Sequence, residues 1–320
     1  MKVTSRLSME PYHFTQVAVA ALRKLYPEQL ADSSFDNTGL LVEAPDRPKN
    51  RQKLVLLTTD LTSAVADEAI NRRSSLIVAY HPIIFRPLKA LSLQDTQQKT
   101  ILRLVQEGIS VYSPHTAVDA APGGLNDWLA DIVTGEETEV VTSPSTRTII
   151  KPTKNAPPPG FEGAGYGRIV RFDTPQALGS IVKRITKGLK AQNGLSVAVP
   201  QSTLPNLKSQ IPITTVGICA GSGGSILNGL DVDLLFTGEL SHHEALAAIE
   251  ANRAVITAGH SNTERIFLEK RLKDRLIDGI LQELDLIVPP VDRIQDIVVI
   301  ASMVDRDPYE IVRLEDKDWK

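Results

Sequence analysis

The sequence has one cysteine among its 320 residues, and this scarcity restricts the chemistry open to the chain. A single thiol, Cys219, can form neither an internal disulfide nor a metal cage made of several cysteines. Proteins of reducing compartments commonly have so few cysteines, so we expect a cytoplasmic protein. A mitochondrial pool stays open, because residues 1–8 contain Lys2 and Arg6 and no acidic residue.

Excess positive charge and long apolar runs are also missing. The chain has 35 Lys and Arg residues against 38 Asp and Glu, a formal net charge of −3, whereas proteins that bind nucleic acid directly usually have clustered basic surfaces. No apolar run approaches the roughly 20 residues that cross a bilayer, so we expect no membrane span. The remaining composition, 42% hydrophobic and 23% charged, is typical of a globular protein with one large or two smaller domains.

The order of apolar segments indicates the fold class. Residues 53–59, 75–80 and 109–112 are strand-prone, and a helical pattern follows each of them. Strands that alternate with helices predict a parallel sheet with right-handed crossovers. A polar segment begins near Gly135, where we place a domain boundary, and further strands and helices lead to a late edge strand at residues 296–302. We therefore predict an α/β protein with two lobes of mixed or parallel sheet flanked by helices.

Metal-capable side chains follow several of these strands. The apolar residues 254–257 lead into His260 and Glu264, which are four residues apart and face one direction if a helix begins at once. His81 and Asp119 follow two other predicted strands. Ligands of open α/β sheets bind beyond the carboxyl ends of the strands, and imidazole with carboxylate suits Zn, Mn or Fe. The joint placement of these four residues predicts a metal site.

Taken singly, each of these residues has a structural explanation. Ser261 and Glu264 match the S-x-x-E capping box, as Ser241 and Glu244 do twenty residues earlier, and on this pattern the odds are about even. A lone histidine such as His81 is more often a satisfied structural residue than a ligand. Aspartates such as Asp119 commonly form turns.

Three further features leave alternatives open. His115 could be a metal ligand, a partner of a ligand or a plain loop residue. Glu239 could be a base or a partner of a ligand, and a solvated loop acid is slightly favoured. The glycine-rich residues 221–225 could hold a phosphate on exposed backbone N–H groups, but a tight turn between strand and helix is the stronger interpretation.

Several stretches together resemble the Nif-three-like family of dinuclear metal proteins, whose members are also called GTP cyclohydrolase I type 2. The stretches follow one another in family order from residue 36 to residue 264. They are Asp36-Asn37-Thr38-Gly39-Leu40, Tyr80-His81-Pro82, His115-Thr116-Ala117-Val118-Asp119 with Gly124-Leu125-Asn126-Asp127, Thr237-Gly238-Glu239 with His242-His243, and Gly259-His260-Ser261-Asn262-Thr263-Glu264.

The resemblance implies a fold in which a middle lobe, about residues 135–244, is inserted into a metal-binding lobe made of residues 1–134 and about 245–320. It implies a ring-like homo-oligomer, a hexamer or trimer of dimers, with metal sites facing an inner cavity. The family ligands carry over onto His81, Asp119, His260 and Glu264, for one or two divalent ions. Tyr80 departs from the two adjacent histidines of many bacterial members, which puts the second ion in doubt, and this form resembles the eukaryotic branch.

Two functions follow from the resemblance. The first is a metal-dependent hydrolase, in which Asp119 and Glu264 bridge two ions, His81 and His260 are terminal ligands, and a nucleotide such as GTP is attacked. The second is a non-enzymatic scaffold with a partner in transcriptional regulation, which adds a nuclear pool to the expected locations. Tyr80 mildly favours the scaffold.

Overall fold

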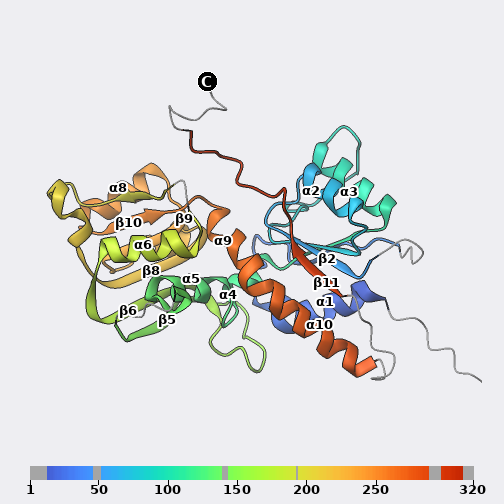
Figure 1. Ribbon diagram of the computed structural model, residues 1–320, viewed down its shortest axis with the longest axis horizontal. Helices are drawn as coiled ribbons and strands as arrows, with labels where there is room; N and C mark the ends of the chain where they lie inside the picture. Colours follow the sequence, from blue (N-terminus) through green and yellow to red (C-terminus); the bar gives the residue numbers. More distant parts are fainter. Residues whose placement is uncertain (1–12, 46–51, 139–142, 192–193, 288–296, 313–320) are drawn as a thin grey trace, which may run out of the picture.

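The computed structural model describes residues 13–45, 52–138, 143–191, 194–287 and 297–312. The suspected address at residues 1–8 and the first residue of the late strand, Asp296, lie outside this part of the chain. Figure 1 shows two groups of strands, each flanked by helices, which confirms the predicted fold class.

The first sheet has the order β1-β4-β3-β2-β11. Strands β4, β3, β2 and β11 are parallel to one another, and β1 is antiparallel to β4. The parallel pairing of the three strands predicted from the apolar segments is confirmed, and the late strand does lie at an edge. The strands are β1 (Gly39–Val42), β2 (Leu54–Thr58), β3 (Leu76–Ala79), β4 (Ser110–Ser113) and β11 (Val298–Ala301).

The second sheet has the order β5-β6-β8-β9-β10-β7. Strands β8, β9 and β10 are parallel, and the other pairs are antiparallel, so the sheet is mixed. The chain returns to the first sheet with β11, so the middle lobe is an insertion. The strands are β5 (Ser145–Pro152), β6 (Gly165–Ala177), β7 (Ser196–Ala198), β8 (Pro212–Ser222), β9 (Leu234–Glu239) and β10 (Ala254–Thr257). The domain boundary near residue 244 stays a prediction. Strand β10 follows this boundary in the sequence but belongs to the second sheet.

Helices follow the local rules of capping and spacing. Helix α3 (Thr96–Glu107) begins after Asp95, whose carboxylate accepts a hydrogen bond from the Gln98 N–H, and it ends at Gly108 with a left-handed φ of 68°. The other α-helices are α1 (Phe14–Leu25), α2 (Ser63–Asn71), α4 (His115–Ala120), α5 (Leu125–Thr134), α6 (Leu178–Gly188), α7 (Gly224–Leu227), α8 (His242–Glu250), α9 (Asn262–Phe267) and α10 (Lys273–Ile287).

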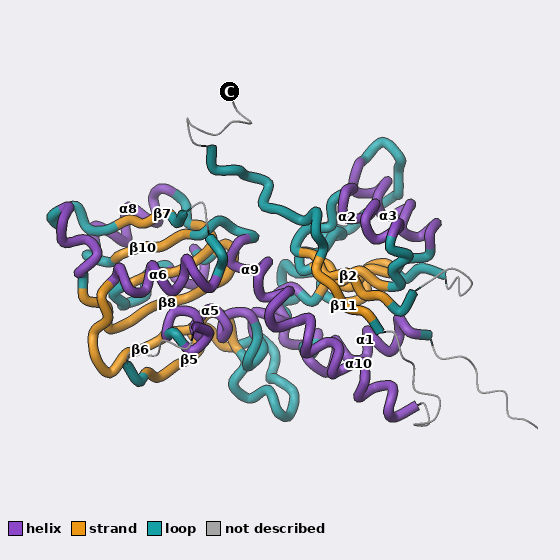
Figure 2. The backbone as a smooth tube through the Cα atoms, viewed as in Figure 1, coloured by secondary structure: helices purple, strands orange, loops and turns teal. Residues whose placement is uncertain are grey.

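The two lobes share one hydrophobic core. A single cluster of buried side chains includes Val78 of the first sheet and Ile256 of the second, and helices α5, α9 and α10 contribute to it. Figure 2 shows α9 between the two groups of strands and α10 continuing from there along the first group, beside α1. A π-helical turn, Leu268–Leu272, joins α9 to α10.

Candidate metal centre

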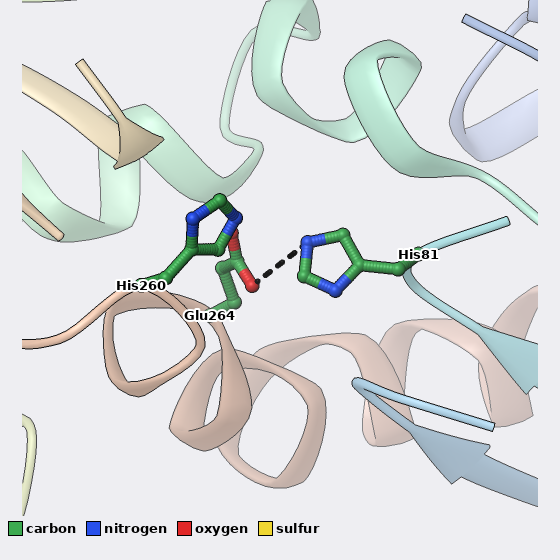
Figure 3. Close-up of side chains that lie close together, drawn as sticks. All are labelled: His81, His260 and Glu264. Carbon is green, nitrogen blue, oxygen red and sulfur yellow. Dashed lines mark ion pairs between the residues drawn. The ribbon is translucent and has the colours of Figure 1, made fainter. Parts of the chain in front are cut away.

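Three potential ligands meet between the two sheets. His81 comes shortly after β3 of the first sheet, His260 follows β10 of the second, and Glu264 lies on α9. One nitrogen of each histidine and one carboxylate oxygen lie within 4.8 Å of one another. The Glu264 carboxylate lies between the imidazoles: Oε2 is 3.3 Å from His81 Nε2, and Oε1 is 3.7 Å from His260 Nε2 (Figure 3).

The turn before α9 presents these groups. Gly259 has a φ of +87°, a conformation that favours glycine, and α9 begins three residues later. Ser261 precedes the helix but makes no side-chain capping bond, because its hydroxyl donates to Asp307 Oδ2 and accepts from Arg265 Nη1. The capping-box alternative for Glu264 is therefore wrong. At Ser241 and Glu244 both bonds of the box are present.

The environment of Glu264 suits a cation. Its side chain is 2% exposed, and Oε2 is a buried acceptor without a hydrogen-bond donor among the described residues. The backbone of Gly221 runs beside the site, with a φ of +58°. A Cβ at that position would lie 2.8 Å from Glu264 Oε1 and 3.0 Å from His260 Nε2, so glycine keeps the space beside the ligand atoms free.

In three histidines near the candidate site, the Nδ1 atom is hydrogen-bonded to a carboxylate. The Nδ1 atoms of His81, His260 and His115 are hydrogen-bonded to Asp60 (3.0 Å), Glu239 (3.0 Å) and Asp36 (2.6 Å), respectively. An ionised carboxylate only accepts, so Nδ1 carries the proton in each pair. The Nε2 atoms are thereby oriented as ligands, which is the usual arrangement around metal-binding histidines.

The acids raise the proton affinity of His81. Burial lowers its pKa, but the hydrogen bond to Asp60 and the negative charges of Asp60 and Glu264 outweigh burial and raise the pKa to about 10. The centre therefore favours positive charge between these two carboxylates, as a metal site does.

Asp119 lies outside this group of three. It was expected in a loop, but it lies on the short helix α4, because residues after β4 turn directly into that helix. The Tyr80 hydroxyl donates to Asp119 Oδ1 at 2.6 Å. Burial raises the pKa of Tyr80 well above its usual value, so the phenol stays neutral, and burial also raises the pKa of Asp119, to about 6. The His115 ring centroid is 5.4 Å from that of His81, which brings a third imidazole beside the centre.

A cavity of about 640 Å³ opens beside these groups. Its size is within the range of small-molecule sites. Two cations line it: Lys154, which pairs with Asp32 at 2.8 Å, and Lys151. Phe35 and Phe85 are 53% and 46% exposed and lie 6.5 Å apart between ring centroids. Asp119, His115, Tyr80, His81, His260 and Glu264 also line the cavity, and Glu239 does not.

Sequence reasoning missed the roles of Asp36, Asp60 and Gly221. Asp36 was noted only as part of a stretch that resembles the family, and Gly221 only as part of a turn or phosphate loop. One signal was available for Asp60: it follows a buried strand directly, as the metal-capable residues do. Its pairing with His81 depends on β2 and β3 being neighbours in the sheet, which residue types alone do not give.

A two-sheet α/β protein with two histidines and a buried glutamate at its strand ends is a candidate metal-binding protein. The family model Duf34/NIF3 (NGG1p interacting factor 3) matches residues 15–293, and the chain belongs to this family. It is 44% identical over 288 residues to a protein NIF3 homolog of Schizosaccharomyces pombe, covering 90% of this chain and 94% of the relative. It is 39% identical over 301 residues to NGG1-interacting factor 3 of Saccharomyces cerevisiae, covering 92% and 95%. The resemblance seen in the sequence is confirmed.

Solved structures agree at the level of the fold. A Bacillus cereus protein related to NIF3 has a TM-score of 0.68 with 20% identity, covering 93% of this chain and 98% of that one. The Staphylococcus aureus protein SA1388 has a TM-score of 0.66 with 22% identity, covering 92% and 99%. Among the described residues, no helix is both long and apolar enough to cross a bilayer.

Proposed function

We propose that the protein is a metal-dependent hydrolase that acts on a nucleotide-like substrate. The observation that carries the proposal is the buried Glu264 carboxylate, which lies between the Nε2 atoms of His81 and His260 on the wall of a cavity. These three residues would hold one divalent ion, of Zn, Mn or Fe. Asp119, with His115 beside it, would serve a second ion.

The chain's own residues have distinct parts in this function. A bound ion would supply Lewis acidity and a lowered pKa for a water molecule. Asp60 and Glu239 keep His81 and His260 in the tautomer and orientation of ligands. Lys151 and Lys154 line the same cavity and would attract an anionic group, and the exposed ring of Phe35 offers a surface for a flat ring. The last three residues support a nucleotide such as GTP.

Metal content tests the ligand assignment. His260→Ala should lower the bound metal per chain at least tenfold after equilibration with Zn, Mn or Fe and desalting, because it removes one of three close ligands. His243→Ala is the matched control, since His243 is exposed on α8 and lies outside the group of three. Elemental analysis gives the ratio, and equal metal in the two variants would contradict the assignment.

Turnover tests the hydrolase itself. Nucleotides and phosphoesters would be incubated with metal-loaded protein, and products followed by chromatography. Any activity should be lost in Asp119→Asn, because the amide cannot act as an anionic ligand, and retained in His243→Ala. Equal activity in the two variants would show that turnover does not depend on Asp119 and would contradict the hydrolase proposal.

A scaffold function is the second candidate. The name of the Saccharomyces cerevisiae relative, NGG1-interacting factor 3, supports a transcription-related partner, and the bond from Tyr80 to Asp119 leaves that acid less available to a second ion. Calorimetric binding of a purified NGG1 homologue, with no turnover of any compound tested, would favour this function.

The assembly and the location belong to the same proposal. We expect a hexamer or a trimer of dimers in solution, and light scattering during size exclusion measures it. We expect a cytoplasmic protein with a nuclear or mitochondrial pool, which fractionation of cells with an antibody would measure.

A further inference from the structure

The C-terminal strap, residues 302–312, continues from the edge strand β11 and is drawn in red in Figure 1. Its first residue is fixed to the first sheet and to α2: Ser302 N–H donates to the Leu57 carbonyl of β2 at 2.7 Å, and its hydroxyl donates to Glu68 Oε2 of α2 at 2.6 Å. Beyond this anchor the strap carries two aspartates, Asp305 and Asp307, that bond to residues around the metal centre.

Asp305 supports the half of the centre that belongs to the first sheet. Its side chain is 3% exposed, and Oδ2 accepts from the Thr59 N–H at 2.7 Å. The Thr59 carbonyl in turn accepts from the His81 N–H at 3.0 Å. Thr59 also directly precedes Asp60, which bonds His81 Nδ1. One buried carboxylate therefore holds the backbone that positions both His81 and its partner.

The same aspartate reaches the half of the centre that belongs to the second sheet. Asp305 Oδ1 accepts from Arg265 Nη2 at 3.2 Å, and Arg265 follows Glu264 in α9. Asp307 Oδ2 accepts from the Ser261 hydroxyl at 2.8 Å, and Ser261 follows His260. Asp305 and Asp307 thus bond to the residues that directly follow Glu264 and His260 in the chain.

The strap also forms part of a second cavity, of about 520 Å³. His81 and His260 line this cavity as well as the larger one, so the two imidazoles lie between the cavities. Asp307, Pro308, Tyr309 and Ile311 of the strap line the second cavity. The strap therefore covers a different side of the centre from the one that opens to Lys151 and Phe35.

We propose that the C-terminal strap is a clamp that sets the spacing between the two halves of the metal centre, with Asp305 as its main positioning residue. The ligands come from two sheets, and Asp305 is bonded to the backbone next to His81 and to the residue next to Glu264. This inference rests on the proposed metal site, because it concerns how that site is held together.

The test uses the full chain and the variants Asp305→Asn and Asp307→Asn. The control is Asp278→Asn, which changes an exposed aspartate on α10. Zn affinity would be measured by competition with a chromophoric chelator. We expect Asp305→Asn to weaken Zn binding at least tenfold, as loss of a residue that supports metal ligands commonly does. Asp307→Asn should weaken it less, because its one bond to Ser261 leaves the Thr59 contact intact.

A second measurement needs no metal. Amide hydrogen exchange of metal-free protein should become faster at Tyr80, His81 and residues 258–265 in Asp305→Asn and stay unchanged in Asp278→Asn. A simple loss of overall stability would instead accelerate exchange throughout the core. Should Asp305→Asn not fold, Asp307→Asn carries the same test at residues 258–265.

The outcomes separate the two proposals. If the wild-type chain binds no metal, the proposed metal site fails, and hydrogen exchange still decides whether the strap is a clamp. Unchanged exchange at both segments overturns the clamp. Wild-type Zn affinity in Asp305→Asn also overturns it, even when the metal site itself is real.

Discussion

Gly221 makes a residue-scale prediction, because its backbone approaches two ligand atoms of the centre. Gly221→Ala would place a methyl group 2.8 Å from Glu264 Oε1 and 3.0 Å from His260 Nε2. We expect bound metal per chain to fall at least fivefold, measured by elemental analysis. We also expect a stability loss of about 1 kcal/mol, because alanine at a φ of +58° is strained.

Gly229→Ala is the matched control for this change. Gly229 has a φ of +79°, and a Cβ there would meet no atom within 4 Å. This variant should have a similar strain and therefore a similar loss of unfolding free energy, but it should keep wild-type metal content. Equal metal content in the two alanine variants would mean that space beside Glu264 is unimportant.

The histidines of the site were easier to predict than their partners. His81 and His260 each come at the end of a buried, strand-prone run, a local pattern that can be recognised in a sequence. Asp36 and Asp60 resemble ordinary turn residues, and their roles depend on which strand lies next to which. Such neighbours are set by long-range pairing, so residue types alone could not assign them.

At the scale of the single element, the S-x-x-E pattern precedes both α8 and α9, but only α8 has the capping hydrogen bonds. Ser241→Ala should lower the free energy of unfolding by about 1 kcal/mol, because the Ser241 hydroxyl accepts from the Glu244 N–H in a complete capping box. Chemical denaturation measures the change, and metal content should stay at the wild-type value. A loss well below 0.5 kcal/mol would show that this exposed cap contributes little.

Helix α5 is tied to the second sheet through a buried ion pair. Asp127 of α5 accepts two hydrogen bonds from Arg168 of β6, at 2.7 and 2.9 Å. Burial raises the pKa of Asp127, but the hydrogen bonds and charge of Arg168 outweigh it, so the folded pKa lies below the usual value of 3.8. The stabilisation is therefore complete above about pH 4 and is lost as the pH falls through the folded pKa.

Asp127→Asn should remove this pH-dependent stabilisation. At neutral pH we expect a loss of about 3 kcal/mol, because Arg168 is 2% exposed and would stay buried without its counter-charge. Urea unfolding between pH 3 and 7 measures both effects, with Asp278→Asn as the exposed control. A variant that loses stability in acid as steeply as the wild type would rule out Asp127 as the source.

Elements with strong patterns were predicted well, and weakly patterned elements were not. The apolar strands β2, β3 and β10 are buried, and each was recognised from its composition. Strand β5 was missed because it is an edge strand with polar residues and no fully buried position. Helix α4 was read as a loop because six residues after Pro114 are too few for a recognisable helical period.

At the scale of the whole molecule, the candidate metal centre bridges two sheets that also share one core. His81 belongs to the first sheet, and His260 and Glu264 follow the last parallel strand of the second. The common placement of these residues beyond strand ends and the family resemblance both predicted that the segments meet, but neither gives their distances. The structure brings together three of the four expected ligands, with Asp119 nearby on Tyr80.

Because the proposed ligands follow strands of both sheets, neither sheet alone supplies the whole site, and binding should stabilise the whole fold. With free metal at about 100 times its dissociation constant, the free energy of unfolding should rise by about 2.7 kcal/mol. Calorimetry should therefore show a melting temperature roughly 5 °C higher with Zn than with chelator, for the wild type and for His243→Ala. His260→Ala should melt at one temperature in both conditions. A wild-type chain that binds Zn without any rise in melting temperature would mean that the ion does not join the lobes.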